Sequence, residues 1–167
     1  MTAGPGNALW SVWSVLCLGL ATPLAAQNLV FDIAPVEACI RAGGGESCAG
    51  RAAEQCMEAT PDGQTTVGMS ACLDRERKHW DGWLNLVYQR LYGELAAQDV
   101  AIQSSAPKQA PALQEMQRAW IRFRDARCSY EATQWGGGTG AGPASLNCHL
   151  HETARQMIYL QSSRLGE

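Results

Sequence analysis

The sequence predicts an all-α fold: an antiparallel bundle of three main helices, preceded by a short N-terminal helical hairpin and stapled by disulfides. Three observations support this prediction. Apolar residues recur at helical spacing over three long stretches, and no stretch of useful length alternates as a β-strand does. Six cysteines also remain once an apolar leader is set aside. The 167 residues suffice for one domain.

The first 26 residues differ from the rest of the chain. They contain no Asp, Glu, Lys or Arg, and an apolar run over residues 9–20 ends before Pro23 and the small pair Ala25-Ala26. Such a run is too short to span a bilayer, for which a helix needs about 20 apolar residues. We therefore predict a signal peptide over residues 1–26 and a mature protein that is periplasmic or secreted, with no stable membrane anchor.

An N-terminal extension, residues 27–55, is predicted to contain short helices. Pro35 suits the first turn of a helix over residues 36–42, which should stop at the three glycines 43–45. A second helix is predicted over residues 46–59, ended by the turn Pro61-Asp62-Gly63.

Three long amphipathic helices are predicted to follow, over residues 67–97, 111–135 and 143–165. In the first, apolar residues recur three, four or seven positions apart, which places them on one helical face, and the other two carry similar apolar stripes. The expected core residues of the three helices are Leu73, Trp80, Leu84, Val87, Leu91 and Leu95; Leu113, Met116, Trp120, Phe123 and Cys128; and Leu150, Ala154, Met157, Ile158 and Leu165. A Ser/Pro loop over residues 104–111 and a flexible, glycine-rich loop over residues 136–142 should connect these helices.

The six cysteines of the mature chain are predicted to form disulfides. An even number of cysteines in a short exported chain favours disulfides, although six cysteines allow fifteen pairings. Their places on the predicted helices favour sequential pairing, in which each bridge joins consecutive elements. The predicted bridges are Cys39–Cys48, Cys56–Cys72 and Cys128–Cys148.

A zinc site is the alternative for part of this set, because Cys148, His149 and His151 lie close together in the sequence. Zinc needs four ligands, or three and a water, and no Cys-x-x-Cys pair supplies the remainder. We therefore predict no metal and no cofactor, and assign His149 and His151 to a helix surface.

The net charge and the lack of a catalytic motif argue against a nucleic-acid-binding protein and against an enzyme. The net charge of −3 gives no electrostatic footprint for nucleic acid. Neither Ser129 nor Ser145 has the motif context of an activated nucleophile. The sequence thus predicts a protein that is not an enzyme and that acts by binding.

Three blocks of sequence resemble the LprI-type family of lysozyme-inhibitor-like exported proteins. The blocks are Cys72-Leu73 with Asp81, Leu84-Asn85 and Tyr88; Gln117-Arg118-Ala119-Trp120-Ile121 with Phe123-Arg124-Asp125 and Cys128; and the glycine loop followed by Cys148, Thr153, Arg155 and Leu160. The resemblance covers about residues 56–165 and leaves Cys39 and Cys48 outside the shared core, so residues 56–167 are predicted to form an LprI-like helical domain.

The resemblance implies a helical extracytoplasmic domain with structural disulfides, and a protein partner, foremost a lysozyme whose cleft the domain would occupy. It supplies no inhibitory residue that could be carried over by position. A general cell-envelope binding module is the alternative, and an unrecognised hydrolase is the least supported one. The sequence does not indicate the oligomeric state.

Several motif residues are predicted to form a structural polar network at a helix junction. Spacings of four, seven and eight residues place members of this set on shared helical sides. Arg124 or Arg155 should pair with Asp81 or Asp125, with Asn85 as a bridge. The full set is Asp81, Asn85, Tyr88, Trp120, Arg124, Asp125 and Arg155.

The glycine loop is a predicted binding element, and the loop over residues 104–108 is a second candidate. A polar enzyme cleft that contains two carboxylates would accept a protruding loop that carries hydrogen-bond donors. The candidate residues are Trp135, Gly137 and Thr139, and the alternative is that the loop merely connects two helices.

Overall fold

The structure, a computed structural model, describes residues 1–2, 28–101 and 105–163. The predicted signal peptide lies outside these residues except for Met1 and Thr2. That assignment and the boundaries of the N-terminal extension therefore stay predictions.

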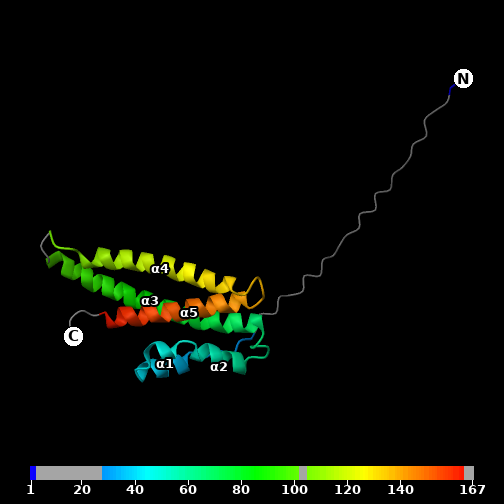
Figure 1. The fold of residues 1–167 in the computed structure, drawn as a ribbon, viewed down its shortest axis with the longest axis horizontal. Coiled ribbons are helices and arrows are strands. Elements are labelled where there is room, and N and C mark those ends of the chain that lie inside the picture. The colour runs from blue at the N-terminus through cyan, green and yellow to red at the C-terminus, as the bar shows by residue number, and fades with distance from the viewer. Residues whose placement is uncertain (3–27, 102–104, 164–167) are drawn as a thin grey trace.

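The described part of the chain is all-α and contains no β-strand, as predicted (Figure 1). It starts with helix α1 (Ala34–Arg41), the short 3-10 helix η1 (Gly45–Cys48) and helix α2 (Arg51–Ala59). The long helices α3 (Thr66–Ala101), α4 (Gln109–Thr133) and α5 (Ala141–Ser162) follow.

The three long helices lie alongside one another, and α1 and α2 lie on the side of α3 and α5 that is remote from α4 (Figure 1). Helix α5 packs against both α3 and α4, and α2 packs against α3. The turn between α4 and α5 stands at one end of the bundle, and the connection between α3 and α4 stands at the other. None of the described helices is long and apolar enough to cross a membrane.

The core follows the predicted helical faces of α3 and α5. Trp80, Leu84, Leu150 and Leu160 are almost completely buried, and Trp80 meets Trp83 edge-on with ring centroids 5.1 Å apart. Helix α4 differs from the prediction, because Phe123 is 56% exposed although it was expected in the core. Leu113 and Cys128 are buried as predicted, and Ala110 is buried with them, so the core face of α4 is rotated away from Phe123.

Three disulfides join the cysteines in the predicted pairs. They are Cys39–Cys48, Cys56–Cys72 and Cys128–Cys148, with Cα–Cα distances of 5.5, 5.7 and 5.3 Å. The first closes α1 onto η1, the second ties α2 to α3, and the third ties α4 to α5 across the turn. Each closed loop removes conformational freedom from the unfolded chain, by about 3 kcal/mol in the chain-entropy model.

The predicted helix over residues 46–59 is broken in the structure, which is a correction. Gly50 has a φ of 97°, in the left-handed region that favours glycine, and it separates η1 from α2. The break lets Glu76 of α3 reach the start of α2. Its Oε1 accepts a hydrogen bond from the Gly50 N–H at 2.7 Å, and its Oε2 accepts one from the Ala53 N–H at 2.7 Å. The backbone donors that a helix start leaves unpaired are thereby satisfied from another helix.

Glu76 is the deepest charged residue in the described chain, with no exposed surface. Besides the two backbone donors, its Oε1 accepts a hydrogen bond from the Trp80 indole Nε1–H at 2.9 Å. A buried carboxylate is tolerated only when hydrogen bonds replace its water shell, and these three donors provide that replacement.

A second carboxylate of α3 caps the next long helix in the same manner. Asp99 accepts hydrogen bonds from the Gln109 N–H at 2.8 Å and the Ala110 N–H at 2.9 Å, at the start of α4. The bond from Gln109 and then that from Ala110 hold the pKa of Asp99 below its ordinary value, although partial desolvation opposes them. Helix α3 thus anchors the starts of both α2 and α4.

Replacement of Glu76 by Ala should destabilise the protein severely. The change leaves two backbone N–H groups and the Trp80 indole N–H unpaired, and each unpaired buried donor costs about 1–3 kcal/mol. We expect the free energy of unfolding to fall by about 3–5 kcal/mol in urea titrations of the oxidised protein. Glu58→Ala, on the exposed side of α2, is the control and should change it little. Equal effects of the two substitutions would contradict the role assigned to Glu76.

Replacement of Asp99 by Asn should remove a pH-dependent contribution to stability. The native pKa of Asp99 is lowered, so its contribution is present above the unfolded pKa of about 3.9 and is lost as the pH falls through the native pKa. The difference between wild type and Asp99→Asn should therefore be largest near neutral pH and shrink toward about pH 2. Urea midpoints measured across this range test the expectation, with Asp81→Asn as control. A difference that grows in acid would refute it.

Candidate functional site

The α4–α5 turn, residues 134–140, is closed by hydrogen bonds of its own backbone. The Gly138 N–H donates to the Trp135 carbonyl at 2.8 Å, and the Ala141 N–H donates to the Gly138 carbonyl at 3.1 Å. Gly136 and Gly137 have φ values of 54° and 83°, which side chains other than glycine rarely adopt. The glycines therefore serve to form a tight turn.

Trp135 is held over the start of α5 by Gly140. A Cβ atom at Gly140 would overlap the six-membered ring of Trp135, so only glycine leaves room for this ring position. The Trp135 side chain is nevertheless 55% exposed. One side of the indole lies against Gly140, and the exposed part of the side chain lines two hollows beside the turn.

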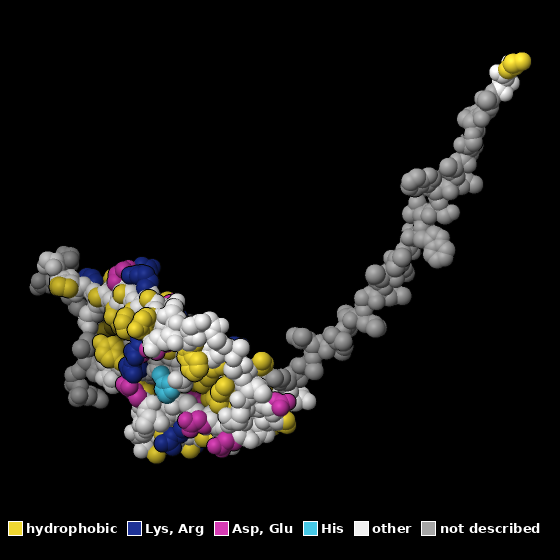
Figure 2. Space-filling view, turned by 45° about the vertical axis from the view of Figure 1, so that its right-hand side comes forward, with side chains coloured by type: hydrophobic (Ala, Val, Ile, Leu, Met, Phe, Trp, Pro, Cys, Tyr) yellow, Lys and Arg dark blue, Asp and Glu magenta, His cyan; other side chains and the backbone are white. Residues whose placement is uncertain are grey.

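Two hollows of about 520 and 420 Å³ lie beside Trp135. Trp135, Ala144, Asn147 and His151 line both of them. Thr139 and Glu54 add polar groups to the larger hollow. We call the surface made by Trp135, Thr139, Asn147 and His151 the turn-end surface. Figure 2 brings this end of the molecule forward and shows apolar, charged and histidine side chains interspersed there.

The structure brings Trp135 and Thr139 together in the larger hollow, but Gly137 is not among the residues that line it. Gly137 contributes through its backbone conformation alone. Asn147 and His151 come from α5, and the sequence reasoning had assigned His151 to a plain helix surface. Their spacing of four residues on one helix could have indicated a shared face.

Beside the turn-end surface, Glu152 binds two arginines, Arg127 and Arg155. Glu152 is nearly buried, and its Oε1 accepts hydrogen bonds from Arg127 Nη1 and Arg155 Nη1, both at 2.5 Å. Arg155 Nε also donates to Glu46 at 3.1 Å. This bond to Glu46 and then the charge of Glu152 raise the pKa of Arg155 further, although desolvation opposes the rise. Both guanidinium groups are therefore engaged within the protein.

Sequence reasoning missed Glu152. A signal was available, because Glu152 follows Cys148 by four residues and Arg127 precedes Cys128 by one. A Cys128–Cys148 bridge places these positions on facing sides of α4 and α5.

The predicted polar network is divided into separate groups. Arg124 pairs with Asp125 at 2.8 Å and stacks on Trp120, with its guanidinium carbon 4.9 Å from the ring centroid. His149 Nε2 lies 3.5 Å from the Asp125 carboxylate.

The remaining members of the predicted network lie elsewhere. Asp81 contacts Asn85 on the same helix at 3.5 Å, and the ring of Tyr88 lies 6.0 Å from that of Tyr92. Arg155 pairs with Glu46 and Glu152 rather than with Asp81 or Asp125.

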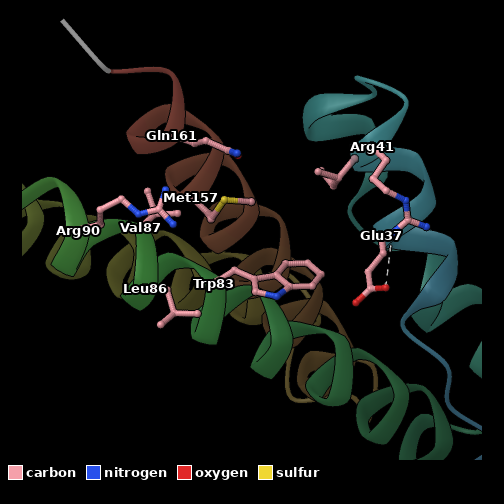
Figure 3. Close-up of a pocket in the computed structure, with 9 residues that line it drawn as sticks. Glu37, Arg41, Trp83, Leu86, Val87, Arg90, Met157 and Gln161 are labelled. Carbon is pink, nitrogen blue, oxygen red and sulfur yellow. Dashed lines mark ion pairs between the residues drawn. The ribbon is translucent and has the colours of Figure 1, made fainter.

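A separate hollow, the α1 groove, lies between α1 and the pair α3–α5 (Figure 3). It measures about 370 Å³, and its apolar lining includes Trp83, Leu86 and Met157. Figure 3 shows Glu37 and Arg41 of α1 facing these side chains across the groove, paired with each other at 3.8 Å. Arg90 stands at the edge and forms no hydrogen bond or ion pair with any described residue.

Metal binding has no support in the described ranges. No group of three or more His, Cys, Asp or Glu side chains there could hold a metal ion. Cys148, the centre of the alternative zinc reading, is bonded to Cys128, so its thiolate is not free to act as a ligand.

Gly140→Ala should displace the Trp135 ring without unfolding the protein. Gly140 has an ordinary helical φ of −68°, so alanine brings only the steric overlap with the indole. We expect a shifted Trp135 indole N–H resonance in ¹H–¹⁵N spectra and a nearly unchanged melting temperature. Gly142→Ala is the matched control, because its Cβ would make an ordinary 3.6 Å contact with Ser70. Identical Trp135 resonances in the two variants would contradict the packing.

Comparisons with known proteins place this architecture in a family. The family model described as lysozyme inhibitor LprI matches residues 56–160. A relative from Rhodobacter capsulatus, described as an uncharacterized 17.7 kDa protein in the puhA 5′ region, is 26% identical over 125 residues. That alignment covers 72% of this chain and 76% of the relative. No solved structure matches. Because the family match spans more than half of the chain, from Cys56 through most of α5, the chain belongs to the LprI family of lysozyme inhibitors.

Proposed function

We propose that this chain inhibits a lysozyme outside the cytoplasm, and that the turn-end surface makes the contact. The observation that carries the proposal is the placement of Trp135, a large exposed aromatic side chain fixed by Gly140 on a tight turn at the end of the bundle. Family membership supports the activity. Three disulfides support an oxidising compartment, since disulfides persist there.

Trp135 fits the role of an interface anchor. Tryptophan is enriched among the few residues that contribute most of the binding energy at protein interfaces. A pre-ordered turn also loses little conformational entropy when it binds, because its backbone hydrogen bonds already fix it. The turn therefore offers a rigid projection of a kind that an enzyme cleft can accept.

Neutral donors, rather than a free cation, would meet the lysozyme carboxylates. Arg127 and Arg155 are tied to Glu152, so neither can leave without abandoning a nearly buried carboxylate. Thr139 and Asn147 beside Trp135 carry uncharged hydrogen-bond donors. A lysozyme cleft that is polar and contains two carboxylates matches donors of this type.

The acidic charge of one layer of the protein favours association with a basic lysozyme. Residues 28–65, which form the layer of α1, η1 and α2 and the segments beside it, contain six carboxylates and two arginines. A basic lysozyme would be attracted to this layer. The attraction mainly raises the association rate, and added salt weakens it.

The α1 groove favours a second candidate, a cell-envelope module that binds another protein. Leu86 is 64% exposed in this groove, and Arg90 beside it has no ion-pair partner among the described residues. A protein segment with an apolar side chain and a carboxylate would suit both features.

Trp135→Ala should weaken inhibition in a cell-wall lysis assay that contains purified protein and lysozyme. Truncation of an interface anchor costs about 2 kcal/mol or more, so the inhibition constant should rise about 30-fold. Leu86→Glu is the control in the α1 groove and should inhibit as wild type does. Melting temperatures of both variants check that the fold is retained.

Other outcomes of this assay decide between the candidates. Full inhibition by Trp135→Ala together with loss in Leu86→Glu would move the contact to the α1 groove. Failure of the wild-type protein to inhibit any class of lysozyme would remove the lysozyme proposal and favour the second candidate. Lysis of cell walls by the protein alone would point to a hydrolase.

A further inference from the structure

Helix α4 carries a mostly exposed apolar row beside its core face. Phe123 and Tyr130 are 56% and 64% exposed, and the alanines of the row are exposed as well. Met116 is half-buried at the border with the core. We call this row the α4 seam; it consists of Ala112, Met116, Ala119, Phe123, Ala126 and Tyr130.

The seam has the spacing of a coiled-coil contact. Its members are separated by four, three, four, three and four residues, which keeps them on one side of a helix over its length. The buried residues of α4, Leu113 and Cys128, lie on a different side. The seam is therefore an additional face rather than a continuation of the core.

Large and small side chains alternate along the seam. The three alanines recur every seven residues, and the large residues Met116, Phe123 and Tyr130 recur every seven residues between them. Two helices pack closely where a large side chain of one meets a small one of the other, because the layers then interdigitate.

We propose that the α4 seam binds the α4 seam of a second copy of this chain in antiparallel orientation. About a two-fold axis near residue 121, Phe123 faces Ala119 of the second copy, the next layer outward pairs Met116 with Ala126, and the end layer pairs Tyr130 with Ala112. Every layer then combines one large and one small side chain. A symmetric dimer requires such a self-complementary patch.

The parallel arrangement does not give this complementarity. It would set alanine against alanine in three layers and large side chains against each other in the other three. The alanine layers would leave gaps and the remaining layers would be crowded, and both defects cost free energy. The alternation therefore selects the antiparallel orientation.

Positive charge beside the α4 seam weakens the association of the two copies. Arg122 flanks the axis, so the antiparallel pairing brings it near Arg122 of the second copy. Like charges repel, and salt screens the repulsion. Self-association should therefore strengthen with salt, in contrast to the binding of a basic lysozyme, which should weaken.

The pairing leaves the turn-end surface free. Trp135 lies beyond the C-terminal end of α4, so a two-fold dimer places the two Trp135 residues at opposite ends of the helix pair. At 1.5 Å per residue this separation is about 40 Å, enough for each copy to present its own turn.

Sedimentation of the oxidised, exported chain at micromolar to millimolar concentrations tests the dimer. The wild type should approach twice the monomer mass, more readily at high salt, and Phe123→Glu should stay monomeric. Val67→Glu, at a residue of α3 that is 63% exposed, is the matched control and should associate as wild type does. A wild type that stays monomeric at every concentration, or equal association of Phe123→Glu and wild type, overturns the proposal.

Single cysteines test the orientation. Arg122→Cys, beside the axis, should form a disulfide-linked dimer on oxidation, seen on a non-reducing gel. Ala112→Cys, at the end of the seam, should not. Cross-linking of Ala112→Cys in preference to Arg122→Cys would establish a parallel pair and overturn the antiparallel one. Loss of lysozyme binding in Phe123→Glu, with a monomeric wild type, would assign the seam to the lysozyme instead.

Discussion

The buried carboxylate of Glu76 is the contact on which the arrangement of the front helices depends. Its oxygens accept hydrogen bonds from two N–H groups at the start of α2 and from the Trp80 indole. A carboxylate without exposed surface is stable only if such donors surround it. Directional hydrogen bonds as well as apolar contacts therefore fix the position of α2 on α3. The Cys56–Cys72 disulfide links the same two helices.

Gly50 links the hydrogen bonds of Glu76 to the candidate site. Gly50 donates to Glu76 and lies next to His151, where an added Cβ would come within 3.6 Å of His151 Nε2. Glu46 of η1 binds Arg155, which shares Glu152 with Arg127 of α4. Side chains of η1, α4 and α5 thereby meet beside the smaller hollow at Trp135, which Arg127, Glu152 and Arg155 line.

Sequence reasoning predicted features that follow from local periodicity. The helices, their connections and the disulfide pairs could be predicted because apolar spacing and cysteine order are local properties. The break at Gly50 and the burial of Glu76 could not, because they depend on a hydrogen bond between residues 26 positions apart. Phe123 was misplaced because an amphipathic pattern shows that a face is apolar, without showing whether the core covers it. The polar network was predicted only in part: Arg124 pairs with Asp125 as expected, whereas Arg155 has a partner, Glu46, that lies 109 residues away in the sequence.

The site is built partly outside the segment that matches the family. The match covers residues 56–160, whereas Glu46 and Gly50 belong to the preceding extension and border the turn-end surface. The turn with Trp135 and Gly140 lies inside the match. If the shared part supplies the projection that enters a cleft, the extension supplies the wall and the acidic layer beside it. Selectivity among lysozymes would then reside in residues 28–55, and the common activity in the turn.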